Sequence, residues 1–408
     1  MNSTTQNICV IGGAGHIGLP LGVSFANAGH QTTLVDIDAN KLERIAKGEF
    51  PYEEAGGAEA LEQALKNKTL FTSTDHAAIK NADIIFLIIG TPIDENLRPR
   101  LNDIQDVVEK HFDYFKDGQI LILRSTVYPR TSKRLHKFFK EKGKDVRVAF
   151  CPERTVQGKT FTEIKTIPQI VSAFDAETLE RVKALFLTIT KQVVVAEKPI
   201  EAELAKLFTN AWRYVSFAVA NQLFQVAAEN GLDFEKIRSI MMEGYDRNKS
   251  FPKAGFAAGP CLLKDTMQLA AFNQNHFQLG HAAMLINEGL PQFILEQLKG
   301  RDRLNRSLSD KTIGILGMAF KADNDDFRDS LSYKLRDIAK TECKRVLCSD
   351  VYIADDSFVT AEELLEQSDI IILGAAHSEY ASIDPKQYPD KYFADIWNRW
   401  PDAENILI

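Results

Sequence analysis

The sequence predicts an α/β fold in which two α/β units flank a long-helix region. Three observations lead to this prediction. Short apolar runs alternate with helical patterns over the first half of the chain, as in a parallel, doubly wound sheet. Residues 201–230 then show helical spacing without Gly or Pro. Strand-like runs return after residue 310.

The size and charge of the chain set limits on its organisation. A domain usually holds about 100–200 residues, so the 408 residues predict several domains. We expect three, at 1–198, 199–300 and 301–408. The net charge of −7 argues against a nucleic-acid or anionic-membrane partner, which would favour a basic face.

The chain also lacks the features of exported and membrane-spanning proteins. Residues 1–7 are polar, and the apolar run 8–11 is too short for a signal peptide. No stretch approaches the roughly 20 apolar residues that span a bilayer. The five cysteines are scattered without CxxC spacing, which predicts no disulfide frame and no metal site. We therefore expect a cytoplasmic protein.

The elements of the first unit follow from these patterns. We expect a helix over 16–28, stopped by Gly29. The apolar, β-rich runs predict strands at 7–12, 32–36, 83–89, 119–123 and 146–150.

The central region and the last third complete the chain. A helix over 201–230 spans about 45 Å, a length typical of a bridge between domains or a dimer interface. Gly231 ends it, and helical patterns continue to residue 299. The polar stretch 301–310 predicts a linker. A second α/β unit then has strands expected at 311–317, 346–349, 370–374 and 392–396.

A glycine motif marks the first unit as a Rossmann domain. Gly13, Gly15 and Gly18 form GxGxxG, with His16 and Ile17 in its variable positions, between a strand and a helix. The first Gly makes the tight turn, the second admits the pyrophosphate, and the third allows close helix packing. Asp36 ends the next strand, where a carboxylate binds ribose hydroxyls and disfavours the 2′-phosphate of NADP. The motif therefore predicts NAD.

Alternatives remain for this site. The glycine motif could be a packing turn, and Asp38 competes with Asp36. The last unit opens on a strand and Gly317 but lacks GxGxxG, so we class it as Rossmann-like, a repeat of architecture alone.

Two loops follow strand ends, where ligands bind in doubly wound sheets. One is Gly90-Thr91-Pro92 and the other is Ser125-Thr126-Val127. Each alone could be a turn or a helix cap. Together they are expected to ring the nicotinamide.

Cys261 is the candidate nucleophile. Small residues precede it and a helical run follows, so the thiol is expected at a helix N-terminus, where the thiolate is favoured. The alternative is a buried structural cysteine. Lys264 and Asp265 argue against that alternative, because an apolar core rarely carries charges so close in sequence.

These motifs, in this order, resemble the nucleotide-sugar 6-dehydrogenase family, which includes UDP-glucose, GDP-mannose and UDP-N-acetylhexosamine 6-dehydrogenases. The resemblance runs from residue 8 to about residue 350. Its motifs are the glycine loop with Asp36; Gly-Thr-Pro at 90–92; Ser-Thr-Val at 125–127; Cys-Pro-Glu-Arg-x-x-x-Gly-Lys at 151–159; Glu203-Leu-Ala-Lys206-Leu-x-x-Asn210; Cys261-x-x-Lys264-Asp265; and Gly317-x-x-Phe320-Lys321 leading to Asp325-Asp326-x-Arg328-x-Ser330.

The resemblance implies a four-electron oxidation of a sugar CH2OH to a carboxylate with NAD. Cys261 would carry a thiohemiacetal and then a thioester. Lys206 and Asp265 would flank the reacting oxygen, with Asn210 one helical turn from Lys206. Glu153 would activate the hydrolytic water, with Thr126 hydrogen-bonded to it.

The resemblance also implies binding residues. Lys264 and Arg328 would lie near the cofactor. The nucleotide sugar would contact Glu153, Arg154, Lys206, Asn210, Phe251, Lys253, Gly255, Phe320 and Lys321. The alternatives are a surface ion pair for Lys206 with Glu203, loop solvation for Glu153 and Arg154, and a solvated charged loop around Arg328.

The sequence departs from the family pattern in three places. The loop from Gly255 to Cys261 is one residue longer than usual, with Ala257 and Ala258 in place of glycines and Pro260 before the nucleophile. The C-terminal part is short. The turn before residue 346 lacks the usual Gly.

The motif Pro-Glu-Arg favours a UDP-N-acetylhexosamine (UDP-GlcNAc or UDP-ManNAc) as substrate, with UDP-glucose as the alternative. Rival functions are a two-electron hydroxyacid dehydrogenase and a nucleotide-sugar-binding regulator without catalysis. The long helix suggests a homodimer.

Overall fold

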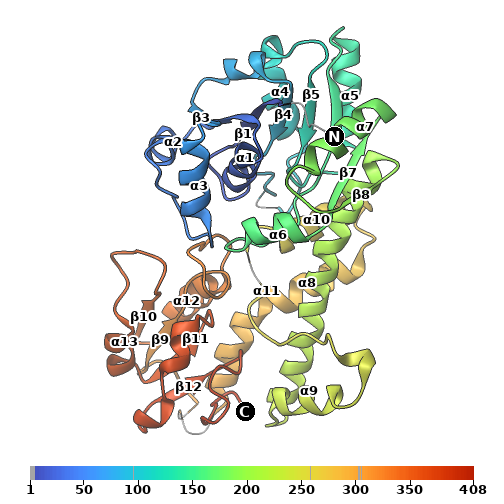
Figure 1. Cartoon of the computed structure of the whole chain (residues 1–408). Helices are drawn as coiled ribbons and strands as arrows, with labels where there is room; N and C mark the ends of the chain where they lie inside the picture. Colours follow the sequence, from blue (N-terminus) through green and yellow to red (C-terminus); the bar gives the residue numbers. More distant parts are fainter. Residues whose placement is uncertain (1–4, 95, 258, 302–303, 305) are drawn as a thin grey trace. The chain divides into compact units, whose positions relative to one another are not determined.

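The computed structural model describes residues 5–408 except 95, 258, 302, 303 and 305. The chain divides into two compact units, Met1–Thr209 and Asn210–Ile408, and each is described by itself (Figure 1). The division falls within the long helix α8, Pro199–Glu229. The boundaries of the three predicted domains stay predictions.

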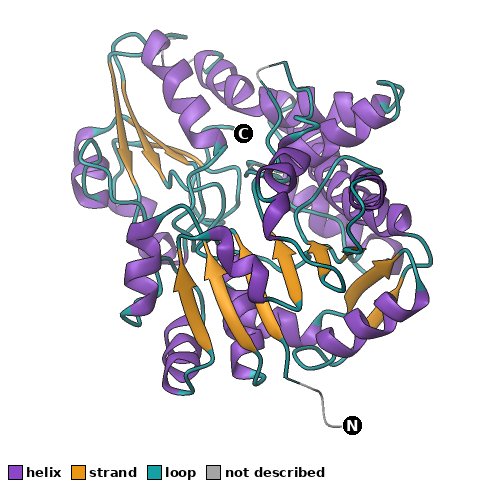
Figure 2. Ribbon diagram, turned by 90° about the horizontal axis from the view of Figure 1, so that it is seen from above, coloured by secondary structure: helices purple, strands orange, loops and turns teal. Residues whose placement is uncertain are grey.

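The first unit is built on an eight-stranded sheet with the order β3-β2-β1-β4-β5-β6-β7-β8 (Figure 2). Strands β1 to β6 are parallel, as predicted, whereas β7 runs antiparallel to β6. The strands are β1 Asn7–Ile11, β2 Gln31–Val35, β3 Leu70–Ser73, β4 Ile84–Leu87, β5 Ile120–Leu123, β6 Arg147–Phe150, β7 Gln169–Ala173 and β8 Val193–Val195.

Two 3-10 helices, His76–Asn81 and Phe112–Tyr114, and seven α-helices complete the described part of this unit before α8. The α-helices are α1 Gly18–Asn27, α2 Ala39–Ala46, α3 Gly57–Lys66, α4 Asp103–Lys110, α5 Thr131–Glu141, α6 Thr160–Thr166 and α7 Ala176–Phe186. The predicted helix over 16–28 is α1, and Gly29 follows it with φ +93°. Three strands escaped the sequence patterns, namely β3, β7 and β8. Each is short or lies toward an edge of the sheet, and β3 exposes Phe71.

The sheet is buried on both faces because alternate side chains enter two separate cores. Ile8 and Val10 pack with helices α1, α2, α3, α6 and α7. Cys9 and Ile11 pack on the other face with α4, α5 and the start of α8. Each fully buried aliphatic side chain contributes about 1.5–3 kcal/mol relative to exposure. This burial on two faces explains why the strands read as continuous apolar runs.

The second unit holds a parallel four-stranded sheet with the order β10-β9-β11-β12. Its strands, β9 Thr312–Leu316, β10 Arg345–Ser349, β11 Ile370–Leu373 and β12 Tyr392–Ala394, match the predicted runs. Its helices after α8 are α9 Phe234–Met242, α10 Leu262–Phe272, α11 Gln278–Lys299, α12 Leu331–Glu342 and α13 Ala361–Gln367.

The stretch 301–310, which the sequence predicts to be a polar linker, also contributes to the core of the second unit. Leu304 and Leu308 are buried in the core of the second unit. Residues 302, 303 and 305 of this stretch lie outside the described residues. Among the described helices, none is both long and apolar enough to cross a membrane.

In both sheets, an aspartate after the second strand in the chain accepts hydrogen bonds from the backbone of the loop after the first strand. Asp36, after β2, accepts a hydrogen bond from the Ala14 backbone N–H at 3.0 Å. Asp350, after β10, accepts from Met318 and Ala319 at 2.6 and 3.0 Å. In each unit a carboxylate therefore holds the loop that follows the first strand, which explains the weak repeat in the sequence.

Glu203 joins α8 to the first unit. Its buried carboxylate accepts hydrogen bonds from the backbone N–H groups of Arg130 and Ser132, at 2.6 and 2.9 Å, and from the Ser132 hydroxyl at 2.6 Å. It therefore caps the N-terminus of α5, which has no cap of its own. The alternative of a surface ion pair with Lys206 is wrong, because Glu203 is buried.

Replacing this cap should destabilise the first unit. Glu203→Ala leaves three buried donors without their acceptor, and we expect a loss of about 2 kcal/mol in unfolding free energy. Urea unfolding measures the loss. Glu180→Ala removes an exposed partner of Lys183 and should cost less than about 0.5 kcal/mol. Equal effects of the two substitutions would contradict this role.

Candidate active site

The glycine loop of the first unit follows the predicted pattern. Gly12 has φ +79°, and the Gly15 N–H donates to the Gly12 carbonyl oxygen at 3.3 Å, so Gly13 lies within a tight turn over residues 12–15. A Cβ on Gly12 would overlap the Ile88 carbonyl oxygen, and one on Gly18 would overlap the Gly12 oxygen. Gly13 packs against Leu34, because a Cβ added to Gly13 would lie 2.8 Å from the Cα of Leu34. Gly13 therefore lies in the predicted tight turn, and Gly18 packs closely, as predicted.

This loop fits a dinucleotide. At Gly15 the nearest atom to an added Cβ is 3.5 Å away, which leaves room for a close approach. The first turn of α1 reads Gly-Leu-Pro-Leu and carries no charge that would repel phosphate. Asp36 is half-buried at the adjacent strand end, while Asp38 instead caps α2 by accepting from Lys41 N–H at 3.0 Å. The structure thus favours Asp36 over Asp38 as the ribose ligand.

The two predicted loops at the strand ends lie together. The Ser125 hydroxyl donates to the Ile89 carbonyl oxygen and accepts from the Ile89 N–H, each at 2.8 Å. The Thr91 hydroxyl donates to the Thr126 carbonyl oxygen at 2.6 Å. Gly90 and Pro92 are exposed beside them. These bonds join the end of β4 to the end of β5, so the loops lie together, and their place around the nicotinamide stays a prediction.

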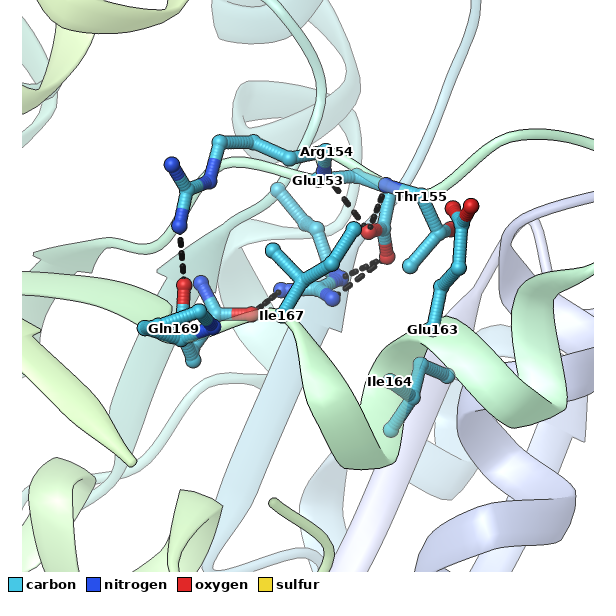
Figure 3. A pocket seen from close by; sticks show the side chains of 9 residues that line it. Glu153, Arg154, Thr155, Glu163, Ile164, Ile167 and Gln169 are labelled. Atoms are coloured by element: carbon cyan, nitrogen blue, oxygen red, sulfur yellow. Dashed lines mark hydrogen bonds and ion pairs between the residues drawn. The ribbon is translucent and has the colours of Figure 1, made fainter. Parts of the chain in front are cut away.

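Glu153 lies in a buried network that the sequence patterns did not reveal (Figure 3). Arg124, which immediately precedes Ser125, is buried, and its Nε–H donates a hydrogen bond to Glu153 Oε2 at 3.1 Å. Its Nη2 also bonds Oε2, and its Nη1 donates to Cys151 O and Gln169 Oε1, both at 3.0 Å. One guanidinium therefore fixes the chain after β6 to the start of β7.

The Glu153 carboxylate is fully used within the protein. Oε1 accepts from the backbone N–H groups of Arg154 and Thr155 at 2.7 and 2.8 Å. With the two bonds from Arg124, four donors fill its four acceptor positions. Burial alone raises the pKa of Glu153, but Arg124, the two backbone N–H groups and the Lys206 ammonium outweigh it and lower the pKa. The group is an ionised, held carboxylate, so the alternative of loop solvation is wrong for Glu153.

A small cavity lies beside this pair. Its lining includes Glu153, Arg154 and the α6 residues Glu163 and Ile164 (Figure 3). The half-buried Arg154 side chain crosses it, and its Nη2 donates to the Pro168 carbonyl oxygen. Arg154 is therefore held by protein here, while Lys206 of α8 is near enough to act on the Glu153 charge.

In the second unit, Cys261 is exposed and precedes the first residue of α10. This is the predicted place at a helix N-terminus, and it excludes the alternative of a buried structural thiol. The other four cysteines are also free thiols, three of them buried. Within the described residues, no three His, Cys, Asp or Glu side chains cluster so as to hold a metal ion.

Asp265 lies one turn along α10 from Cys261 and is fully buried. Its Oδ2 accepts from Asn210 Nδ2 at 2.6 Å. The Lys264 ammonium lies 2.6 Å from Oδ1 and forms an ion pair with Asp265. The structure therefore brings Asn210, Lys264 and Asp265 together, while the expected placement of Lys206 beside Asp265 stays a prediction.

The loop before Cys261 is clamped at two glycines. Gly255 exchanges hydrogen bonds with the side chain of Asn221, at 2.9 and 3.0 Å, and a Cβ there would overlap Trp397. Gly259 has φ +100°, and a Cβ there would lie 2.5 Å from the Phe320 ring. Ala258 lies outside the described residues. Phe320 therefore packs on the cysteine loop, which supports its predicted place in the site.

Arg328 faces the same loop. Its guanidinium donates to Asp326 through Nε at 2.9 Å and Nη2 at 2.6 Å. The hydrogen bond to Asp326 raises the pKa of Arg328, and the charge of Cys261 adds to this. The Arg328 cation is thus near the nucleophile. Phe251 packs on the core of this unit, Lys253 is exposed, and Lys321 lies 5.9 Å from the Phe320 ring centre.

Comparison with known proteins places the chain. It matches three domains of the UDP-glucose/GDP-mannose dehydrogenase family: the NAD binding domain over residues 6–190, the central domain over 200–289 and the UDP binding domain over 314–402. The chain belongs to the UDP-glucose/GDP-mannose dehydrogenase family. It is accordingly an NAD-dependent nucleotide-sugar dehydrogenase, as the resemblance implied.

Individual relatives of this dehydrogenase are distant but collinear with it. It is 27% identical over 391 residues to a UDP-N-acetyl-D-mannosamine dehydrogenase of Methanocaldococcus jannaschii, covering 94% of this chain and 88% of the relative. It is 27% identical over 415 residues to a UDP-glucose 6-dehydrogenase of Bacillus subtilis, covering 96% and 91%. The structure of a UDP-D-ManNAc dehydrogenase from Pyrococcus horikoshii has the same fold, with a TM-score of 0.90 at 24% identity, covering 97% and 96%.

Two residues of this dehydrogenase's site escaped sequence reasoning. Arg124 stands directly before the Ser-Thr-Val motif, so its place at a strand end was a usable signal. Asn221 lies eleven residues, or three helical turns, after Asn210 on α8. Its partner Asn287 is 66 residues away, and only the folded chain shows their bond of 2.9 Å.

Breaking the buried pair should cost stability in a pH-dependent way. Arg124→Met leaves the Glu153 charge buried without its partner, and we expect a loss of about 3 kcal/mol at pH 7. Because the folded-state pKa of Glu153 is lowered, its contribution is present above its ordinary pKa and lost as pH falls through the lowered value. The double variant Arg124→Met/Glu153→Gln should recover stability and show a weaker loss in acid.

Urea unfolding between pH 3 and pH 7 measures both effects. Arg147→Met, which removes a partly exposed partner of Asp145 and Asp175, is the control and should cost under about 1 kcal/mol. A double variant as unstable as Arg124→Met alone would contradict the pairing.

Proposed function

We propose that the chain oxidises C6 of a UDP-N-acetylhexosamine, UDP-GlcNAc or UDP-ManNAc, to the carboxylate through a thioester on Cys261. The observation that supports this most is the exposed thiol at the start of α10, beside the Arg328 cation and one turn from the buried Asp265. The Methanocaldococcus relative that acts on UDP-N-acetyl-D-mannosamine supports the choice of sugar. NAD+, when bound, accepts the hydride that leaves C6 in each of the two oxidations.

The protein's part begins with the thiolate. After the first oxidation, the Cys261 sulfur adds to the C6 aldehyde and forms a C–S bond, and the carbonyl oxygen becomes the thiohemiacetal hydroxyl. Loss of the second hydride and the hydroxyl proton leaves the thioester. Water then attacks the thioester carbon, the C–S bond breaks, and carboxylate and thiolate result. Covalent catalysis divides a difficult oxidation into easier steps.

Charged groups are assigned to the oxygen atoms of these intermediates. The Lys206 ammonium stabilises the developing oxyanion. Asp265, fixed by Asn210, positions the water or accepts the proton. Glu153 and Thr126 are assigned to the hydrolytic water, for which Glu153 would exchange one of its four protein donors. The lowered pKa of Glu153 favours orienting that water over removing its proton.

The binding residues are assigned in the same way. Lys264 and Arg328 would contact the cofactor. The nucleotide sugar would be contacted by Arg154, Phe251, Lys253, Gly255, Phe320 and Lys321. Arg154 would donate to the N-acetyl carbonyl oxygen after its bond to the Pro168 carbonyl oxygen breaks.

UDP-glucose is the second candidate substrate, because the Bacillus subtilis relative is a UDP-glucose 6-dehydrogenase at the same identity. A two-electron hydroxyacid dehydrogenase is disfavoured by the match to a UDP binding domain in the last third. A non-catalytic regulator is disfavoured by the exposed thiol. The five free cysteines fit the reducing cytoplasm that we propose as its location.

We also propose a homodimer formed through α8. Four exposed apolar side chains, Trp212, Val219, Leu223 and Val226, recur at spacings of seven, four and three residues. At 100° per residue they lie within about 60° of one another on one face of the helix. Trp212 is 72% exposed. A stripe of this kind on a long helix fits a second copy of the same helix.

The nucleophile has a direct test. Cys261→Ala removes the only atom that can carry the thioester, so uronate formation should fall by at least about 10³-fold. Absorbance at 340 nm and mass spectrometry follow NADH and uronate. Cys343→Ala changes a half-buried thiol of the same unit and should retain activity. A Cys261→Ala protein with wild-type turnover would refute the mechanism.

The substrate choice is tested by turnover of UDP-GlcNAc, UDP-ManNAc and UDP-glucose with NADH counted per sugar. We expect two NADH per sugar and a higher kcat/KM for an N-acetylhexosamine. One NADH per sugar would instead indicate a two-electron enzyme. Turnover of UDP-glucose alone would leave only the second candidate.

The dimer is tested by sedimentation. Trp212→Glu places a charge within the apolar stripe and should shift the protein from about twice the chain mass to the monomer. Lys249→Glu changes a surface residue on the same unit and should leave the mass unchanged. A wild-type monomer at micromolar concentration would end the proposal.

A further inference from the structure

Residues 50–55 connect two parts of the first unit that the motifs treat separately. This segment, between α2 and α3, reads Phe-Pro-Tyr-Glu-Glu-Ala. It is bonded to the glycine loop through Tyr52 and to the start of α6 through Glu54. Neither residue belongs to a motif discussed above.

Tyr52 contacts the cofactor loop at two points. Its hydroxyl donates to the Gly15 carbonyl oxygen at 2.8 Å. Its ring lies 4.0 Å, centre to centre, from the ring of His16. Gly15 O also accepts from Leu19 N–H at 3.0 Å, at the start of α1. Two donors therefore fix the direction of this carbonyl.

The direction matters for phosphate binding. The Gly15 carbonyl and the His16 N–H belong to one trans peptide plane and point in opposite directions. Fixing the carbonyl therefore fixes the His16 N–H. Backbone N–H groups at a helix N-terminus are the donors that bind a pyrophosphate, so Tyr52 orients one of them without itself touching the ligand.

Glu54 attaches the segment 50–55 to the start of α6. Its carboxylate accepts from the backbone N–H groups of Gly158 and Thr160, at 3.0 and 2.5 Å, and from the Thr160 hydroxyl at 3.0 Å. Ala55 N–H donates to Gly158 O at 3.2 Å. These bonds tie residues 54 and 55 to the chain just before α6.

From α6 the contacts continue to Glu153. Glu163 of α6 accepts from Val156 N–H at 2.7 Å, and Glu153 accepts from Thr155 N–H at 2.8 Å. Glu163 and Glu153 both line the cavity of Figure 3. Hydrogen bonds that are linked by short stretches of the chain thus run from Gly15 to Glu153 within one unit.

We propose that residues 52–55 are a strap that couples NAD+ binding to the segment 151–160, with Tyr52 and Glu54 as its positioning residues. Binding of the pyrophosphate favours the peptide orientation that Tyr52 holds. The strap then favours the ordered arrangement of 156–160 and, through it, of Glu153. The inference rests on the proposed cofactor site at Gly13–Gly18.

Two measurements test the strap. Tyr52→Phe removes one hydroxyl and keeps the ring, so we expect the Kd for NAD+, by calorimetry, to rise about threefold to tenfold. The control Tyr388→Phe removes a hydroxyl in the second unit and should leave the Kd unchanged. Hydrogen exchange of the 156–160 amides should slow on adding saturating NAD+ to the wild type. This protection should be smaller in Tyr52→Phe and in Glu54→Gln.

The outcomes separate the two proposals. A wild type that does not bind NAD+ overturns the cofactor site. A wild type that binds it, with Tyr52→Phe equal in Kd, overturns the role of Tyr52. Amides 156–160 whose exchange ignores NAD+ in the wild type overturn the coupling.

Discussion

The hydrogen bonds of the buried Arg124 guanidinium are the interaction on which the first sheet depends at the C-terminal ends of its strands. A charge with almost no solvent contact is tolerated only when its donors are matched, and here they reach a carboxylate, a carbonyl and a side-chain amide. Those acceptors follow β6 or begin β7, where the strand direction reverses. The parallel sheet ends its regular pattern at this point, and Arg124 supplies the cross-link that the reversal requires. The arrangement of Glu153 and the turn after it follow from that cross-link.

Much of the fold was predictable because burial leaves a mark on sequence. Strands covered on both faces, such as Ile84–Leu87 and Ile370–Leu373, consist entirely of apolar residues. Strand β3 reads Leu-Phe-Thr-Ser with Phe71 exposed, so neither continuous apolarity nor clean alternation marks it. Strand β8 has three residues and only one neighbour in the sheet. Of the missed strands, β3 and β8 are therefore defined more by pairing than by burial, whereas β7 is buried from residue 170 to residue 173.

The site divides in the same way between local and long-range information. The glycine loop, Asp36 and the group Cys261-Lys264-Asp265 are local, and short spacings sufficed for them. The contacts of Arg124 with Gln169, of Asn221 with Asn287 and of Tyr52 with Gly15 join residues 37 to 66 positions apart. Such residues hold the motif residues in place, and a spacing rule for the motif does not include them.

The altered cysteine loop shows which parts of a motif the fold requires. Two glycines remain, Gly255 and Gly259, and both have positive φ and a side chain pressed against Cα, Trp397 in one case and Phe320 in the other. Ala257 replaces a glycine at a buried position and packs with Tyr214 and Leu262, so its methyl group is accommodated. Pro260 gives up a backbone N–H, but the bond that ties the loop to Asp329 comes from Gly259. The methyl group of Ala257 and the missing donor of Pro260 are therefore tolerated. The glycines that remain are those whose replacement would move the thiol, which argues that the loop still serves to present Cys261.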